Sequence, residues 1–202
     1  MTAVMSRRET NKLKCRERIL NASRRLFSEN GYDNTMIDEI ADMAEVSKAT
    51  VYNYFPNKES LLLGITEEEL ENICHLISHD WEDAKNSGDK IYRVLEQFIL
   101  DSLPNIDLSR RISYLNSCEK SPLYAARITM TDMIRNLVLK AQEEEVFRKD
   151  LDAEIIVDVL MGILLTAQFQ WQRIETYSPE FLANKLDQLL KIMLAGIYTE
   201  TP

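Results

Sequence analysis

Glycine and proline are scarce in this chain, with five of each among 202 residues. Because both residues mark turns and interrupt helices, their scarcity favours long helices joined by few turns. Hydrophobic residues make up 45% of the sequence and charged residues 28%, which is ordinary for a protein with a packed core. We therefore expect an all-α fold, with either one large core or a small domain attached to a larger one.

Cysteine is sparse as well, at positions 15, 74 and 118, with no CxxC spacing. This pattern indicates neither a disulfide framework nor a zinc module. The longest uncharged apolar stretch, which begins after Asp158, is too short and too rich in glutamine to span a bilayer, and residues 1–14 lack the apolar core of a signal peptide. We expect a cytoplasmic protein with no membrane partner.

Motifs typical of enzymes are missing too. The five glycines are too widely spaced for a phosphate-binding loop or a GxSxG motif. His75 and His79 lie four residues apart beside Cys74, a spacing that can hold a metal, but two solvent-facing histidines explain it more simply because no third ligand is nearby. The acidic residues at 67–71 are interpreted as a solvated helix face. We expect no enzymatic activity, no metal and no cofactor.

Positive charge is concentrated near the amino terminus. Residues 1–60 contain ten Lys or Arg against nine Asp or Glu, whereas residues 61–202 contain fourteen against twenty-four. Within residues 1–25 there are eight basic residues and only two acidic ones. A basic arm that leads into an amphipathic helix suits a polyanionic partner, although a solvated, partly disordered tail explains the cluster equally well.

Three short helical segments are expected within residues 16–55. Apolar residues at helical spacing predict a helix over 16–29, which Asn30 and Gly31 end. Thr35, followed by Asp38, predicts the capped start of a second helix. Ser47 predicts the cap of a third, in which Val51 and Phe55 turn inward. Asn57 then caps a long fourth helix that begins at Lys58.

The second and third of these helices are typical of a helix-turn-helix, which places its second helix in the major groove of DNA. Residues 46–58 contain no Asp or Glu, whose negative charge a phosphate backbone would repel. Lys48, Tyr52, Tyr54 and Lys58 are expected to meet backbone oxygens, while Lys48, Thr50 and Asn53 can reach base edges. The alternative, a small helix inside a bundle, leaves too many polar side chains on this helix unexplained.

The segment from Arg18 to Leu62, RILNASRRLFSENGYDNTMIDEIADMAEVSKATVYNYFPNKESLL, resembles the DNA-binding domain of the TetR family of transcriptional regulators. The resemblance rests on shared residues at fixed spacings, which are Ile19, Leu20, Ala22, Leu26, Phe27, Gly31, Tyr32, Thr35, Ile40, Ala41, Val46, Ser47, Thr50, Tyr52, Tyr54, Phe55, Lys58 and Glu59. These positions span about a quarter of the chain.

The resemblance implies roles for individual residues. Thr35 would bind a phosphate through its hydroxyl and the amino terminus of the second helix. Lys48, Ala49 and Thr50 would meet base edges or nearby phosphates, and the residues that would hold the backbone are Tyr52, Tyr54 and Lys58. Two positions depart from the family pattern, because Glu45 and Ala49 stand where the family usually has glycine. Glu45 is expected to hold a strained turn and to place a negative charge close to DNA, and the Ala49 methyl can contact a thymine methyl.

We expect residues 1–60 to form the DNA-binding domain and residues 61–202 to form a helical ligand-binding and dimerisation domain, with about nine helices in all. The helices expected beyond Lys58 are 58–85, 90–103, 108–118, 122–145, 153–175 and 179–198. The last two carry apolar arcs that are wider than one buried face requires. This surplus predicts a homodimer in which these two helices of each subunit form a four-helix bundle, as the resemblance also implies.

The resemblance further implies a small-molecule effector in the second domain. Candidate walls of its pocket are large side chains on the helices that would surround it, namely Phe98, Tyr114, Cys118, Tyr124, Met130, Met133, Ile134, Gln168 and Trp171. For each of these residues alone, ordinary core packing is the simpler interpretation.

The function expected from the sequence is a regulator, most often a repressor, that binds a palindromic DNA operator as a dimer and is released by a small molecule. The alternative is an all-α binding protein, or an enzyme built on a helical bundle, whose helix-turn-helix no longer reads DNA. Neither the operator, the effector, the regulated genes nor the sign of regulation follows from the sequence.

Overall fold

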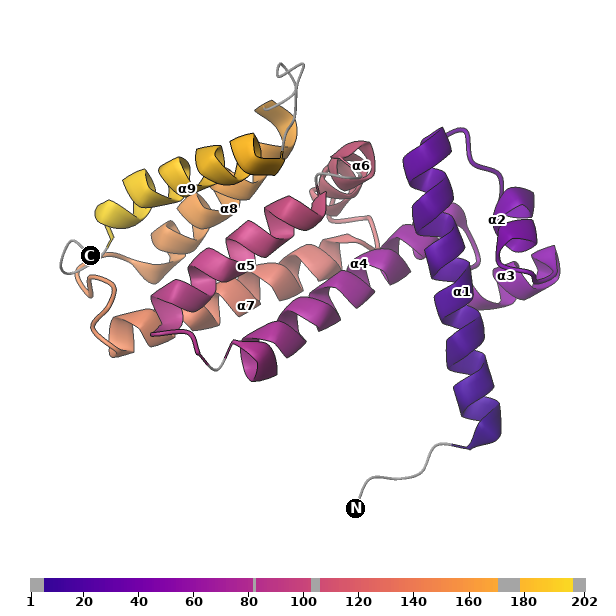
Figure 1. The fold of residues 1–202 in the computed structure, drawn as a ribbon, viewed down its shortest axis with the longest axis horizontal. Coiled ribbons are helices and arrows are strands. Elements are labelled where there is room, and N and C mark those ends of the chain that lie inside the picture. Colours follow the sequence, from indigo (N-terminus) through magenta and orange to yellow (C-terminus); the bar gives the residue numbers. More distant parts are fainter. Residues whose placement is uncertain (1–5, 82, 103–105, 171–178, 198–202) are drawn as a thin grey trace. The chain divides into compact units, whose positions relative to one another are not determined.

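The computed structural model describes residues 6–81, 83–102, 106–170 and 179–197, and in these ranges the chain is helical with no strands, as expected. Nine α-helices follow one another along the described chain (Figure 1). They form two compact units, residues 1–68 and residues 69–202, with the division inside α4 (Lys58–His75). Within the described ranges, no helix is long and apolar enough to cross a membrane.

Helix α1 (Arg7–Asn30) begins well before the predicted start at Arg16, so most of the basic arm is helical. The Ser6 side chain accepts a hydrogen bond from the Glu9 backbone N–H, and Glu9 accepts one from the Ser6 N–H at 2.8 Å. This reciprocal cap starts the helix. The apolar pattern did not predict that residues 7–14 are helical, because this part of α1 buries no apolar face.

Helix α2 (Ile37–Met43) is not capped by Thr35 and Asp38, so that prediction is wrong. The Met36 backbone N–H donates to Glu39 Oε2 at 2.7 Å, which places the cap one residue later. Ile40 and Ala41 on its inner face are buried.

Helix α3 (Lys48–Tyr54) begins at Ser47, whose Oγ accepts from the Thr50 backbone N–H at 3.1 Å. The predicted cap is therefore confirmed. Val51 and the following Phe55 are 0% and 4% exposed, which confirms that this seam turns inward. A helix of seven residues is far too short to be stable alone, so its position depends on this seam.

Within the first unit, α4 approaches α1 and α3 at Gly64. A Cβ atom at this position would lie 2.9 Å from Phe55 Cε1 and 3.0 Å from Leu20 Cδ2. Leu61, Leu62 and Ile65 of the same helix are fully buried. Gly64 therefore permits a contact between helices that any side chain would push apart.

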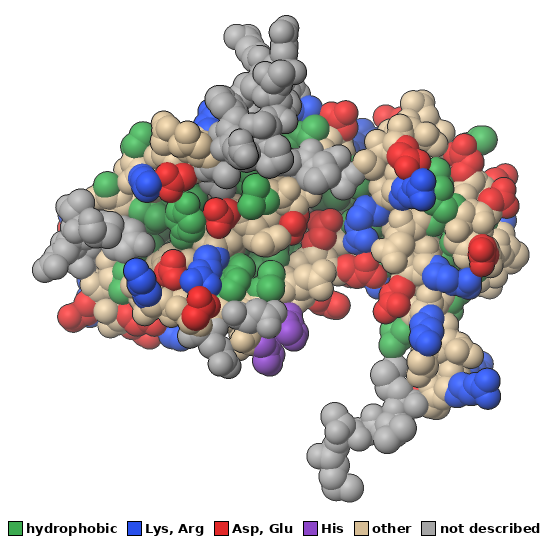
Figure 2. All heavy atoms as spheres, in the orientation of Figure 1, with side chains coloured by type: hydrophobic (Ala, Val, Ile, Leu, Met, Phe, Trp, Pro, Cys, Tyr) green, Lys and Arg blue, Asp and Glu red, His purple; other side chains and the backbone are tan. Residues whose placement is uncertain are grey.

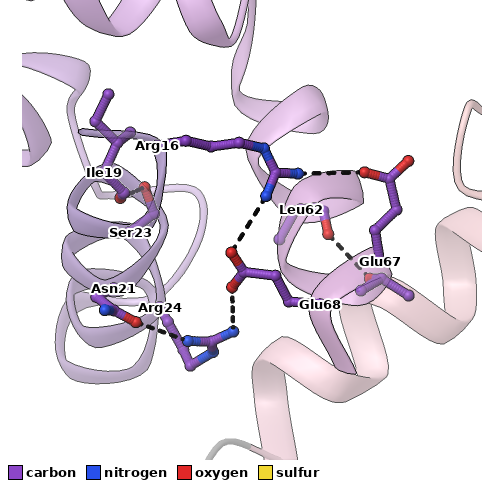
Figure 3. Close-up of polar contacts among 9 residues, drawn as sticks. Arg16, Ile19, Asn21, Ser23, Arg24, Leu62, Glu67 and Glu68 are labelled. Carbon is purple, nitrogen blue, oxygen red and sulfur yellow. Dashed lines mark hydrogen bonds and ion pairs between the residues drawn. The ribbon is translucent and has the colours of Figure 1, made fainter. Parts of the chain in front are cut away.

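Ion pairs join α1 to the same part of α4 (Figure 3). Arg16 lies 3.2 Å from Glu68 and 3.4 Å from Glu67, and Arg24 lies 3.2 Å from the second oxygen of Glu68. The Arg16 guanidinium also lies 5.7 Å from the centre of the Phe55 ring. These charges surround the close contact at Gly64 and fix the register of α4 against α1.

The second unit contains the rest of α4 and five further helices, which are α5 (Ser87–Ser102), α6 (Ile106–Asn116), α7 (Tyr124–Glu143), α8 (Ala153–Gln170) and α9 (Pro179–Ala195). Helix α7 packs against α5, α6 and α8, while α5 also contacts α8 and α9. The buried residues of α7 recur at helical spacing along one face, and they are Ala126, Met130, Ile134, Leu137, Val138 and Ala141.

The end of α4 differs from the sequence prediction. Helix α4 was expected to continue to residue 85, but it ends at His75 and a π-helical turn covers Leu76–Asp80. Ser78 Oγ donates to the Cys74 carbonyl and Lys90 Nζ to the Ile77 carbonyl, so side chains replace part of the regular helix bonding. The predicted extension of α8 to residue 175 lies outside the described residues.

Helix α5 starts three residues before its predicted start at Lys90, because both Asn86 and a distant residue cap it. Asn86 Oδ1 accepts a hydrogen bond from the Asp89 backbone N–H at 2.9 Å. Glu144, just after α7, accepts hydrogen bonds from the Ser87 backbone N–H at 2.8 Å and from Ser87 Oγ at 2.9 Å. Both Ser87 and Gly88 are buried there. The Asn86 cap is a local signal that the sequence prediction passed over, whereas the Glu144 contact comes from a residue far along the chain.

The two glycines Gly64 and Gly162 provide a matched test of this packing. Gly64→Ala should lower the free energy of unfolding by about 1–3 kcal/mol, since its methyl would overlap the Phe55 ring. At Gly162 of α8 an added Cβ meets nothing within 4 Å, so Gly162→Ala should be neutral or stabilise by up to about 1 kcal/mol. Urea unfolding followed by circular dichroism measures both, and equal effects would contradict the close contact at Gly64.

Candidate nucleic-acid interface

The outer face of α3 carries the polar side chains that the sequence assigned to DNA. Lys48, Ala49, Tyr52 and Asn53 are exposed, while Val51 on the opposite side is fully buried. Tyr52 is 45% exposed on the same face. One side of this short helix thus holds the domain together and the other is free to meet a ligand.

Lys48 forms an ion pair that the sequence reasoning missed. Its Nζ lies 2.7 Å from Asp38 Oδ1 of α2, and both side chains are more than half exposed. The hydrogen bond with Asp38, followed by the charge of the same carboxylate, raises the pKa of Lys48. Lys48 is therefore a cation at any physiological pH, but one that is already paired.

Thr50 is half-buried and its hydroxyl lies 2.8 Å from Ser47 Oγ, beside the cap of α3. Hydroxyl oxygens keep a second acceptor position and can exchange partners, so this contact leaves Thr50 able to meet a phosphate or a base. Asn53 is exposed one turn further along the helix.

Tyr54 and Lys58 lie further from the exposed face than the sequence suggested. Tyr54 is half-buried, and its pKa is raised first by burial and then by a hydrogen bond with Cys15 of α1. Lys58 Nζ donates to the Asp33 carbonyl at 3.2 Å and lies 4.6 Å from the centre of the Tyr32 ring. Both residues join α3 or α4 to neighbouring segments, and a contact with DNA would add to that role.

Thr35 is placed differently from the expectation. Its side chain is 2% exposed, and its hydroxyl donates toward the carbonyls of Leu26 at 3.1 Å and Gly31 at 2.8 Å. The hydroxyl closes the turn after α1 and is not presented to a phosphate. The sequence suggested a cap because threonine is common there, whereas this threonine satisfies carbonyls at the end of the preceding helix.

The turn between α2 and α3 has the strain that was predicted. Glu45 has φ = 54°, in the left-handed region where a residue with a side chain pays a steric penalty. Its carboxylate is 85% exposed and lies 3.9 Å from Arg18 of α1, too far for a strong ion pair. Glu45 thus holds both an unfavourable backbone conformation and a largely uncompensated negative charge beside α3.

Charged side chains surround this helix-turn-helix (Figure 2). Lys and Arg follow the length of α1, and acidic side chains lie over α2. The exposed cations of α1 are Arg7, Arg8, Lys12, Lys14, Arg18 and Arg25. Positive charge is therefore available on α1 as well as on α3.

The candidate effector residues of the second unit are not brought together as one set. Tyr114 is 68% exposed and Cys118 is also exposed, so neither is a wall of an internal pocket in this structure. Met130 and Ile134 are buried core residues, while Phe98, Tyr124 and Met133 are half-buried. The Gln168 side chain and Trp171 lie outside what the structure describes.

Cys74 and the two histidines do not form a multidentate metal site. The rings of His75 and His79 stack with centroids 4.6 Å apart, and Cys74 Sγ lies 3.7 Å from Met133 Sδ. Among the described residues, no group of three or more His, Cys, Asp or Glu side chains is placed to hold a metal.

The fold and the exposed face of α3 define a helix-turn-helix DNA-binding protein. Residues 19–65 match the family model of bacterial regulatory proteins of the tetR family. The chain is 24% identical over 200 residues to the HTH-type transcriptional repressor DhaR of Mycobacterium sp. (strain GP1), an alignment that covers 92% of this chain and 93% of that protein.

Two further proteins extend this comparison. A region of 86 residues is 30% identical to the biofilm operon regulator IcaR of Staphylococcus aureus (strain Newman) and covers 43% of this chain and 46% of that protein. The crystal structure of Thermus thermophilus FadR in complex with lauroyl-CoA superposes with a TM-score of 0.66 at 25% identity, over 92% of this chain and 96% of that one. Residues 19–65 thus match the DNA-binding domain of the TetR family, and over most of its length the chain is similar to the transcriptional repressors DhaR and FadR.

The strained, acidic turn gives a test with two substitutions. Glu45→Gly should raise the free energy of unfolding by about 0.5–1 kcal/mol, because it relieves the left-handed strain. It should also tighten DNA binding by removing a negative charge. Glu45→Gln removes the charge alone, so it should tighten binding with little gain in stability. Thermal unfolding and fluorescence anisotropy separate the two effects, and a destabilised Glu45→Gly protein would contradict the strain.

Proposed function

We propose that this protein is a dimeric transcriptional repressor that binds a palindromic DNA operator through α3 and is released by a small molecule. The observation that carries the proposal is the division of α3 into a buried seam and an exposed polar face. A helix of this kind, held against its own domain by two apolar side chains, is free to enter the major groove. The match of residues 19–65 to the tetR family and the similarity to the repressor DhaR support the same conclusion.

On DNA, Lys48 and Asn53 would meet base edges and Tyr52 would meet the sugar-phosphate backbone. Lysine donates to guanine O6 and N7, and asparagine can pair with adenine. Ala49 would lie against a thymine methyl, because its own methyl is exposed. Tyr54 and Lys58 would hold the backbone from the edge of the site while keeping their contacts within the domain.

The second unit supports dimerisation through its exposed apolar side chains. Ile155 and Val159 lie one turn apart on α8 and are 64% and 45% exposed, and Leu165 of the same helix is 46% exposed. Ile192 of α9 is 76% exposed. Gly162 leaves open space on α8. Apolar side chains gathered on two helices in this way mark an interaction surface, and a twofold partner would cover them.

The effector would bind in the second unit, among its half-buried side chains Phe98, Tyr124 and Met133. The solved structure of Thermus thermophilus FadR holds lauroyl-CoA, which makes that compound a reasonable first probe. Because the effector must favour a state that does not fit the operator, it would lower DNA affinity by the same factor by which DNA lowers effector affinity.

The role of the exposed face of α3 in DNA binding is tested with a triple variant, Lys48→Ala, Tyr52→Ala and Asn53→Ala. Wild-type protein should bind DNA taken from upstream of its own gene more tightly than a scrambled duplex, as measured by fluorescence anisotropy. The triple variant should lose this preference entirely while its thermal unfolding stays close to wild type, since all three side chains are exposed. A variant that keeps the preference would show that α3 does not read the sequence, and the helical-bundle alternative would then be favoured.

The dimer is tested by placing charge on α8. The double variant Ile155→Glu and Val159→Glu should be monomeric in analytical ultracentrifugation, because buried carboxylates without partners oppose association. Its affinity for the operator should fall by roughly two decades or more, since the α3 helices of two subunits are no longer held together to bind both half-sites. Leu139→Glu, at a 44% exposed position of α7, is the matched control and should remain dimeric. If both proteins dimerise equally, α8 is not the interface.

A further inference from the structure

The ion pair between Lys48 and Asp38 is unexpected on a surface that meets DNA. Lys48 is the first residue of α3 and the only Lys or Arg within that helix. Its Nζ lies 2.7 Å from a carboxylate that belongs to α2, and neither side chain is buried. Exposed ion pairs of this kind contribute little to the stability of the fold, so stability does not explain why a carboxylate lies beside Lys48.

The other carboxylates of this region have different surroundings. Glu39 accepts the Met36 backbone N–H and so caps α2. Glu45 lies 3.9 Å from Arg18 of α1. Asp42 is exposed on α2. Of these four carboxylates, Asp38 is the one that the structure pairs with a cation of α3.

We propose that Asp38 is a specificity-determining residue, which holds Lys48 for base contacts and keeps its charge from binding DNA phosphates of any sequence. This inference rests on the proposed DNA-binding function of α3. It assigns to Asp38 a role in positioning another side chain, without contact between Asp38 and DNA.

On non-operator DNA, Lys48 should add little to the free energy of binding. There, Lys48 would exchange the Asp38 carboxylate for a phosphate, which replaces one anion by another and leaves Asp38 unpaired near the negatively charged backbone. Such an exchange yields little binding free energy. The paired Lys48 also releases no additional counterion, so it should contribute little to the salt dependence of binding.

On the operator, Lys48 does not need to leave Asp38. An ammonium group has three donors, so one N–H can stay on Asp38 while another donates to a base edge such as guanine O6. Asp38 then limits the flexible lysine stem to one direction, which reduces the conformational entropy lost on binding. The same ion pair would thus weaken binding to random DNA and support binding to the operator.

The test uses Asp38→Asn and its matched control Asp42→Asn, which removes the same charge from an exposed site on the same helix. Both full-length proteins are titrated by fluorescence anisotropy onto DNA from upstream of the gene and onto a scrambled duplex, across a salt series. With Asp38→Asn, affinity for the scrambled duplex should rise roughly tenfold, and its salt slope should steepen by about 0.9 per subunit, the value for one more phosphate contact. Affinity for the upstream DNA should stay the same or fall.

Dependence on Lys48 is tested by adding Lys48→Ala to each protein. The effect of Asp38→Asn should vanish in that background, because no lysine remains to be freed. The inference is overturned if Asp38→Asn changes both duplexes equally, if it behaves as Asp42→Asn does, or if its effect survives in the Lys48→Ala background. If wild-type protein binds neither duplex at low salt, the proposed DNA-binding function itself is overturned. The three outcomes above overturn only the role of Asp38, because in each of them the wild-type protein still binds DNA.

Discussion

The close contact at Gly64 is the constraint on which the DNA-reading surface depends. Helix α3 has only seven residues and two buried apolar anchors, so it cannot hold a direction without a surface to dock on. That surface exists because α4 has no side chain at position 64, which lets Phe55 and Leu20 lie against its backbone. The ion pairs of Arg16 and Arg24 with Glu67 and Glu68 then fix the helices around this point.

This packing explains how one short helix serves two purposes. Because Val51 and Phe55 supply all of the apolar anchoring, the remaining positions of α3 are free to carry polar groups without loss of stability. The strain at Glu45 and the acidic side chains of α2 are tolerated for the same reason, since the fold of this unit is set by its buried seam. We interpret the negative charges beside α3 as a means to limit binding to DNA in general, and so to favour one sequence over others.

The fold was largely predictable from sequence, because apolar periodicity and caps are local signals. Ser47 and Asn57 were recognised as caps, and the buried seam at Val51 and Phe55 followed from their spacing.

The errors of the sequence prediction arose mainly where residues far apart in the chain decide the structure. Thr35 bonds to carbonyls at the end of α1 rather than capping α2, and Glu144 binds the first residue of α5 from far along the chain, beside the local Asn86 cap. The pairing of Lys48 with Asp38 could not be foreseen either, since it depends on the angle between two helices.

The second unit was predictable only as a set of helices. The buried residues of α7 recur at helical spacing, but the exposure of Tyr114 and Cys118 could not be predicted, since a large side chain at helical spacing can face either side. Exposed Ile155 and Ile192 gave the surplus of apolar surface that the sequence had already suggested for the last two helices. Whether an apolar side chain lies in the core or at an interface depends on how the helices pack together, which the local sequence does not determine.

The central claim is that two copies of α3, related by a twofold axis, read one operator. Hydroxyl-radical footprinting of the wild-type protein on DNA from upstream of its own gene tests this most directly. The account predicts two protected half-sites with inverted sequences, centred about 10–10.5 base pairs apart or a multiple of that distance. A single protected site with no inverted partner, at protein concentrations that saturate the DNA, would contradict it.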